Sequence, residues 1–143
     1  MSDQSYSNHE RMVTGYHKVG FTLLALTLIG AGWNLWISVG TPNLHNAILI
    51  LALTFVLVLV GYYARLFALK AQDRAIRAEE NMRHFVQHGK LLPAALTMRQ
   101  IIGIRFASDD EFQALAADAA EKGTSEDDIK KSIKNWKADT YRV

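Results

Sequence analysis

The chain has no cysteine, and between residues 19 and 64 it has no Asp, Glu, Lys or Arg. Without cysteine it can form neither disulfides nor thiolate metal sites. Without a charged side chain in its apolar middle it lacks the relays by which membrane proteins move protons or ions. The formal net charge is +2, so there is also no general positive excess of the kind that attracts nucleic acid. The composition therefore argues against ion relays and nucleic-acid binding.

What the chain does have is two long uncharged runs, at residues 19–39 and 44–64. A helix of 21 residues covers about 31 Å, which matches the thickness of a bilayer core. Gly40 and Pro42 between the runs suit a tight turn. The sequence therefore predicts a transmembrane helical hairpin over residues 19–64. A cleaved signal peptide fits less well, because the first run is longer than a signal core and acidic residues precede it.

The basic residues beside the two spans predict their orientation. The linker between the spans has none, whereas the leader, residues 1–18, has Arg11 and Lys18 and the twenty residues after Ala64 have five more. Lysine and arginine accumulate on the cytoplasmic side of bacterial membranes. We therefore expect a multi-pass protein with both termini in the cytoplasm. Interfacial aromatic belts would then contain Trp33 and Trp36 outside and Tyr16, Tyr62 and Tyr63 inside.

The second span has no helix stop at its end. No proline or glycine lies between Gly61 and Gly89, and good helix formers dominate the charged stretch 65–89. We therefore expect one helix from 44 to about 88, about 65 Å long, that extends into the cytoplasm. Two ion pairs at i,i+4 spacing are expected on its sides, Asp73–Arg77 and Glu79–Arg83. One face carries what we call the apolar seam: Phe67, Ala71, Ala75, Ala78, Met82 and Phe85.

The remaining segment, 94–143, is predicted to form a small cytoplasmic domain of three helices. The first begins at Thr97, with Gln100 completing a capping box; the second is capped by Ser108 and stopped by Gly123; the third is capped by Ser125. Their expected apolar faces are Ile101, Ile102 and Phe106, then Phe112, Leu115 and Ala119, then Ile129, Ile133 and Trp136. So small a domain has little core of its own. We therefore expect it to dock on the apolar seam, in the same chain or in a neighbouring one.

Several of these segments resemble a known family. The stretches "ALKAQDRAIRAEE", "LTMRQIIGIRFASDDE" and "IKKSIKNWKADTYRV", with "SNH" before the first span, are similar to small two-span bacterial membrane proteins catalogued as a domain of unknown function. The resemblance covers nearly the whole chain and implies a bacterial inner-membrane protein. It carries over no activity, cofactor or catalytic residue.

Three sets of residues are candidates for a metal site, a haem site or a polar contact between helices within the membrane. Glu80, His84 and His88 share one helix face and could ligate a metal, but they extend over two turns. His9 and His17 flank the inner end of the first span, and His45 lies at the outer turn. No histidine is therefore placed inside the bilayer, where it could hold a haem between the two spans. Asn34, inside the first span, suits a hydrogen bond to a neighbouring helix better than transport. We therefore predict no catalytic, cofactor-binding or metal site and no bound cofactor.

Two macromolecular contacts were also considered for the end of the chain. Lys130, Lys134 and Lys137 would share a face of the third helix, beside Trp136 and Tyr141, and could meet anionic lipid; an ordinary solvated face is the alternative. A helix-turn-helix reading of the last two helices places three acids, residues 126–128, against phosphates, so no nucleic acid is expected.

The fold class predicted from these patterns is an all-α membrane protein: a hairpin, an extended second helix and a three-helix domain. Its expected role is a non-catalytic membrane anchor or scaffold, or an accessory subunit of an inner-membrane complex, with a protein partner for its cytoplasmic part. No enzymatic activity is expected. The alternative is a homo-oligomeric transport or channel-like assembly, with Thr27, Asn34 and Thr54 facing its axis.

Overall fold

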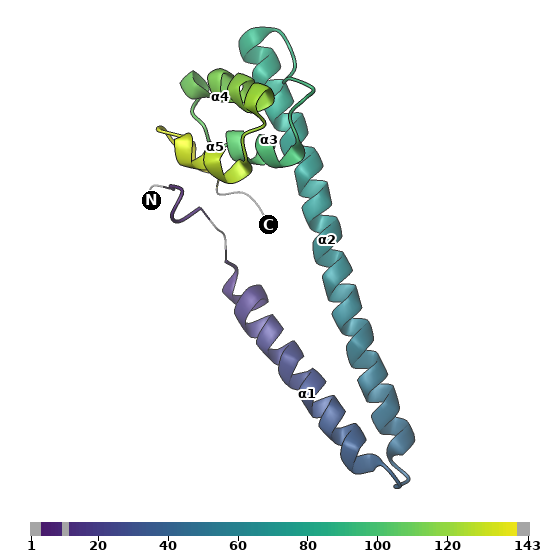
Figure 1. Ribbon diagram of the computed structural model, residues 1–143. Coiled ribbons are helices and arrows are strands. Elements are labelled where there is room, and N and C mark those ends of the chain that lie inside the picture. Colours follow the sequence, from purple (N-terminus) through teal and green to yellow (C-terminus); the bar gives the residue numbers. More distant parts are fainter. Residues whose placement is uncertain (1–3, 10–11, 140–143) are drawn as a thin grey trace. The chain divides into compact units, whose positions relative to one another are not determined.

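The computed structural model describes residues 4–9 and 12–139, and within them every regular element is a helix, as predicted. In chain order these are η1 (Thr14–Gly20), α1 (Phe21–Ser38), α2 (Leu44–His88), α3 (Met98–Ile104), α4 (Asp109–Lys122) and α5 (Glu126–Ser132) (Figure 1). They divide into two compact units. The hairpin unit comprises residues 12–67, and the C-terminal unit comprises 4–9 with 68–139. The helix α2 contributes to both.

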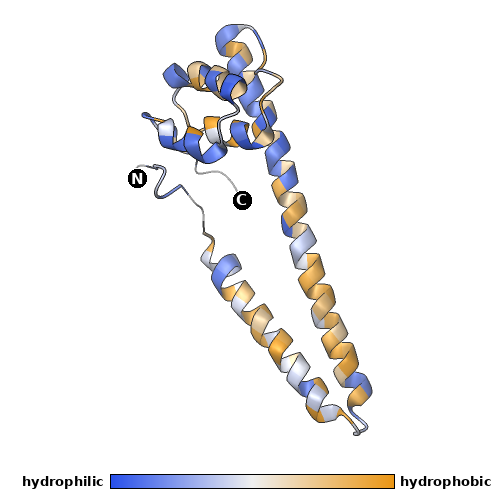
Figure 2. Ribbon diagram, viewed as in Figure 1, coloured by the Kyte–Doolittle hydropathy of each residue, from blue (hydrophilic) through white to orange (hydrophobic). Residues whose placement is uncertain are grey.

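The hairpin unit contains two helices that are long and apolar enough to cross a membrane, Thr14–Ser38 and the first part of α2. Figure 2 shows apolar residues along α1 and this part of α2, and hydrophilic ones farther along α2. Large apolar side chains point outward over the whole unit; Trp36, for example, is 76% exposed. Water disfavours such a surface and lipid does not, since apolar burial is the main stabilising term in aqueous folding.

Within the hairpin, the side chains that turn inward follow a heptad pattern. Five buried or half-buried positions on each helix are spaced alternately by four and three residues: Leu24, Leu28, Ala31, Leu35 and Ser38 on α1, and Leu44, Ala47, Leu51, Thr54 and Val58 on α2. This spacing is typical of antiparallel helices that pack side by side. The fully buried members are Ala31, Ser38, Ala47 and Thr54, and small residues of this kind let helix backbones approach closely.

The ends of the hairpin unit are closed by short contacts. At the linker, Gly40 adopts a positive φ of 78°, and the Thr41 amide and hydroxyl both donate to the Ser38 carbonyl. The predicted tight turn is thus confirmed. At the other end, the Arg65 guanidinium lies 5.8 Å from the centre of the Tyr16 ring.

The helix α2 runs without interruption from Leu44 to His88, as predicted. It stops at Gly89, which has a φ of 69° that favours glycine. Two side chains of the last turns then hold the returning chain. The Asn81 side chain accepts from the Leu92 amide at 3.1 Å, and the Nδ1 atom of His84 lies 2.6 Å from the Lys90 carbonyl.

The core of the C-terminal unit combines α3, α4 and α5 with one face of α2. Its fully buried side chains include Ile104, Phe112 and Ile129, and Ile76 joins them from α2 at 5% exposure. The capping box of Thr97 and Gln100, the cap at Ser125 and the stop at Gly123 are all confirmed. The predicted cap at Ser108 is wrong: its side chain makes no capping bond, and the Glu111 amide bonds the Ser108 carbonyl instead.

The expectation that this unit docks on the apolar seam of its own chain is wrong. The face of α2 that packs is formed by Ile76, Glu80 and His84, whereas Met82 and Phe85 of the seam are 61% and 51% exposed. Ala71 and Glu80 are nine residues apart, which places them on opposite sides of an α-helix. The reason is chemical: the segments docked on α2 present backbone amides and carbonyls, which polar side chains can bond and alanines cannot.

The third helix of the unit is shorter than expected. It ends at Ser132, and Ile133 is already extended, with ψ of 123°. The Glu111 carboxylate accepts from the backbone amides of Lys134 and Asn135, and Trp136 pairs with Ala107 in an isolated antiparallel bridge. Trp136 therefore packs from an extended segment, not from the third helix.

Candidate interaction surface

Arg83 on α2 joins its own helix to α4 and to the loop before α4. Its Nη1 atom lies 3.1 Å from Glu80, its Nε donates to Asp109 at the start of α4 at 2.8 Å, and its Nη2 donates to the Ala107 carbonyl at 2.8 Å. Its guanidinium also stacks over the Phe112 ring, 4.1 Å from the ring centre. A planar fork of five donors is suited to this arrangement and a lysine is not. The predicted pair Glu79–Arg83 is not formed, because Arg83 turns to these partners.

The electrostatics around Arg83 differ between its two carboxylate partners. Glu80 is buried, and burial raises its pKa against the opposing effect of the Arg83 hydrogen bond. Asp109 lies at the surface, and the hydrogen bond from Arg83 lowers its pKa. The pKa of Glu111 is also lowered, chiefly by the hydrogen bond from the backbone amide of Lys134. The two lowered values follow from hydrogen bonds that join segments of the unit.

Glu80, His84 and His88, the residues considered for a metal, do not form a ligand set. Glu80 is paired with Arg83, and His84 is held by the Lys90 carbonyl with its ring 4.8 Å from that of His88, centre to centre. Across residues 4–9 and 12–139, no three histidine or acidic side chains are grouped to hold a metal ion. This helix face is instead part of the packing between α2 and the segments that fold onto it.

The N-terminal leader is docked on the C-terminal unit, which the sequence did not predict. The Tyr6 hydroxyl donates to Asp127 at 2.8 Å, and the His9 ring lies 5.8 Å from the rings of both Phe106 and Trp136. The Gln4 side chain bonds both backbone groups of Asp139, its Oε1 accepting from the amide at 2.8 Å. The two hydrogen-bonded pairs are 121 and 135 residues apart, so no local pattern could signal the contact.

Lys130 takes part in the same cluster. Its Nζ atom lies 2.7 Å from Glu126 and 3.2 Å from the Nε2 atom of His9. The other ring nitrogen of His9, Nδ1, lies 2.6 Å from the Tyr6 carbonyl. Lys130 is therefore largely enclosed, and the predicted lipid-facing row is not formed. Lys134 and Lys137 follow the end of α5, and Tyr141 lies outside the described residues.

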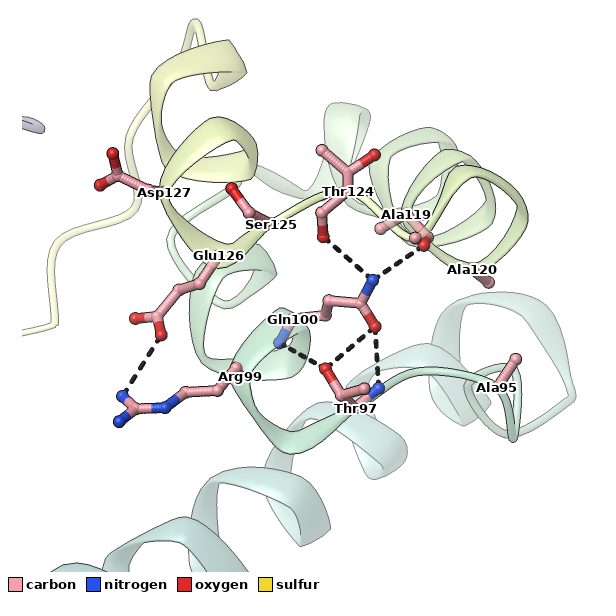
Figure 3. A pocket seen from close by; sticks show the side chains of 11 residues that line it. Ala95, Thr97, Arg99, Gln100, Ala119, Ala120, Thr124, Ser125, Glu126 and Asp127 are labelled. Carbon is pink, nitrogen blue, oxygen red and sulfur yellow. Dashed lines mark hydrogen bonds and ion pairs between the residues drawn. The ribbon is translucent and has the colours of Figure 1, made fainter.

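A cavity of about 530 Å³ lies between the starts of α3 and α5 and the end of α4. Gln100 forms its floor (Figure 3). The Gln100 amide nitrogen donates to the carbonyls of Ala119 and Thr124, and its oxygen accepts from the Thr97 amide. Arg99 and Glu126 on the rim are paired with each other at 3.4 Å. The polar groups that line the cavity are thus already bonded to protein, and none is arranged as a nucleophile with a base.

The remaining candidates from the sequence stay apart. His17 lies in η1, where its ring bonds the backbone of Val13, and His45 is exposed at the start of α2. Thr27 and Thr54 donate their hydroxyls to carbonyls of their own helices, Leu23 and Ile50. Asn34 is half-buried in α1.

Two charged residues beside the apolar seam have no partner in the described chain. Arg74 and Glu79 are both exposed, and neither forms an ion pair or a hydrogen bond within residues 4–9 and 12–139. The seam and these two charges together form what we call the outer face of α2. It is turned away from the segments that pack on Ile76 and Glu80.

Comparisons with known proteins give a family and no function. The whole chain, residues 1–143, matches the model of a family of unknown function, DUF6526. No curated protein matches the chain, and no solved structure does.

Proposed function

We propose that this chain, which belongs to DUF6526, a family of unknown function, is a non-catalytic membrane scaffold or accessory subunit. The hairpin unit would anchor it in a bacterial inner membrane, and the C-terminal unit would bind a protein partner in the cytoplasm.

One observation carries this proposal: the polar side chains of the C-terminal unit are used to join its own segments. Arg83, Gln100 and Glu111 each bond backbone groups that lie 19 or more residues away. Catalysis needs polar groups that are free to act on a substrate. Side chains committed in this way instead hold a rigid platform, which is what a partner-binding module requires.

The docked leader supports the proposed topology. Tyr6 and His9 precede the hairpin and contact Asp127 and Phe106, which follow it. Such contacts favour a topology in which both ends of the hairpin lie on the same side of the membrane. The basic residues that flank the spans favour the cytoplasm as that side.

The test compares the full chain with a version truncated after Gly89, both tagged at the N-terminus and purified from membranes in mild detergent. We expect the full chain to retain a protein partner in quantitative mass spectrometry and the truncated chain to lose it. The control is carbonate extraction, which must leave both versions in the membrane fraction. A truncated hairpin that retains the partner would contradict the proposal.

The transport alternative gains no support from the hairpin unit. Its polar groups include two threonine hydroxyls, and both bond to carbonyls within their own helices. A closed ring with a wetted axis, seen in the purified full chain, would favour transport over the scaffold.

A further inference from the structure

The outer face of α2 is apolar, exposed and available. Besides Met82 and Phe85, Val86 beside the seam is 75% exposed. Because the segments of the C-terminal unit cover the opposite side of the helix, a second body can lie along the seam without displacing them. Exposed apolar side chains clustered on one helix face, rimmed by charges, are typical of protein interaction sites.

The seam has the spacing of a helix pair. From Ala71 to Phe85 its members are separated alternately by four and three residues, which is the heptad pattern of two helices packed side by side. In that pattern Ala75 and Met82 take position a, and Ala71, Ala78 and Phe85 take position d. Three alanines allow the two helix axes to approach closely, and the larger side chains at the end bury most of the area.

The charges beside the seam indicate which helix is the partner. Arg74 precedes an a position and Glu79 follows a d position, so they occupy positions g and e. They are five residues apart, about 140° around the helix, and cannot reach each other on their own chain. In a parallel pair of identical helices, however, g of one helix lies beside the e position five residues later in the other. Arg74 of each copy would then meet Glu79 of the second copy, twice by symmetry.

A membrane sets the direction of such a pair. Two copies inserted with the same topology have their α2 helices parallel, related by an axis along the membrane normal. This step rests on the proposed hairpin anchor. Confinement to one membrane also raises the effective concentration of the seam, so a short contact can suffice.

We propose that the outer face of α2 binds the same face of a second copy of this chain. The result is a parallel two-fold dimer, joined by the seam from Ala71 to Phe85 and by two Arg74–Glu79 ion pairs. Isologous dimers of this kind are the commonest oligomers of identical chains. The C-terminal units then face outward on both sides of the pair and remain free for partners.

The first experiment is disulfide cross-linking in native membranes, which is clean because the chain has no cysteine of its own. Ala78→Cys places thiols near the two-fold axis, within the short distance that a disulfide needs. Arg77→Cys, one residue away and exposed on another side of the helix, is the matched control. We expect cross-linked dimer from Ala78→Cys at least about fivefold above the control under mild oxidation, since only the first position faces its copy.

The second experiment exchanges the charges in the Ala78→Cys background. Arg74→Glu alone, or Glu79→Arg alone, replaces both attractive pairs by repulsive ones and should lower cross-linking about fivefold. The double exchange restores opposite charges across the dimer and should restore cross-linking. This rescue is specific to a parallel pair of identical helices, because an antiparallel pair places g positions beside g and e beside e, so that Arg74 would not meet Glu79.

Equal cross-linking at residues 77 and 78, or no rescue by the double exchange, would overturn the dimer. Carbonate extraction of the same samples separates this failure from that of the anchor. Chains that stay in the membrane without cross-linking at Ala78 would overturn the dimer alone, whereas chains released by carbonate would overturn the anchor on which it rests.

Discussion

Glu111 shows how single side chains determine the path of the chain at its end. Its carboxylate accepts from the amides of Lys134 and Asn135 at 3.0 and 2.8 Å. These bonds coincide with the end of α5 and with the extended segment that brings Trp136 to Ala107. A charged acceptor makes hydrogen bonds about twice as strong as a neutral one. Losing the charge should therefore loosen this segment.

The effect should depend on pH. The bonds lower the pKa of Glu111 in the folded chain, whereas the pKa of a glutamate in an unfolded chain is about 4.3. Its stabilisation is thus fully present above that value and is lost as pH falls through the lower, folded value. Glu111→Gln should reduce the stability of the C-terminal unit at pH 7, and the difference from the parent should shrink as the pH falls below the unfolded value. Glu80, whose raised pKa acts in the opposite sense, is common to both chains and cancels.

The measurement is urea unfolding in micelles, followed by the fluorescence of Trp136 in a chain with Trp33→Phe and Trp36→Phe. Glu121→Gln, an exposed residue of the same helix, serves as the control and should have no effect at pH 7 or at pH 3. A Glu111→Gln deficit that is as large at pH 3 as at pH 7 would show that the charge is not responsible.

At the scale of elements, α2 has two faces with different tasks, and adjacent residues can separate them. Ile76 is 5% exposed and lies in the core, whereas Ala75 points outward in the seam. Ile76→Ala should destabilise the C-terminal unit by about 3 kcal/mol, from lost burial and the cavity left behind. Ala75→Arg should change it by less than about 0.5 kcal/mol, because Ala75 lies outside the core of that unit.

Limited proteolysis of segment 94–139 distinguishes the two outcomes. We expect cleavage to accelerate strongly for Ile76→Ala and to stay at the parent rate for Ala75→Arg. If Ala75→Arg accelerates cleavage instead, the unit docks on the seam after all, as the periodicity alone suggested.

At the scale of the whole molecule, the proposed topology makes a prediction for intact cells. Thr41 lies in the turn between α1 and α2, and Ser132 is exposed at the end of α5. With both termini cytoplasmic, Thr41→Cys should react with an impermeant maleimide in intact cells and Ser132→Cys should react only after lysis. The reverse pattern would invert the orientation, and equal labelling of both would rule out the hairpin.

Sequence patterns were sufficient for most features that depend on neighbours along the chain, with the Ser108 cap, the Glu79–Arg83 pair and the end of α5 as exceptions. The two apolar runs, the turn at Gly40, the uninterrupted α2 and the caps at Thr97 and Ser125 each follow from length, composition or a spacing of three or four residues. The heptad pattern inside the hairpin was also within reach, but in a run where nearly every residue is apolar the small residues mark it only weakly.

The tertiary structure alone decided which face of α2 the C-terminal unit covers and where the leader lies. Periodicity ranks faces by hydrophobicity and so favoured the seam, yet the docked segments have carbonyls and amides that need Arg83, His84 and Asn81. The contacts of Tyr6 and His9 join residues more than a hundred positions apart, and no local pattern encodes such a pair. Local energetics determine helices and turns, whereas the matching of polar groups across space determines how those helices meet.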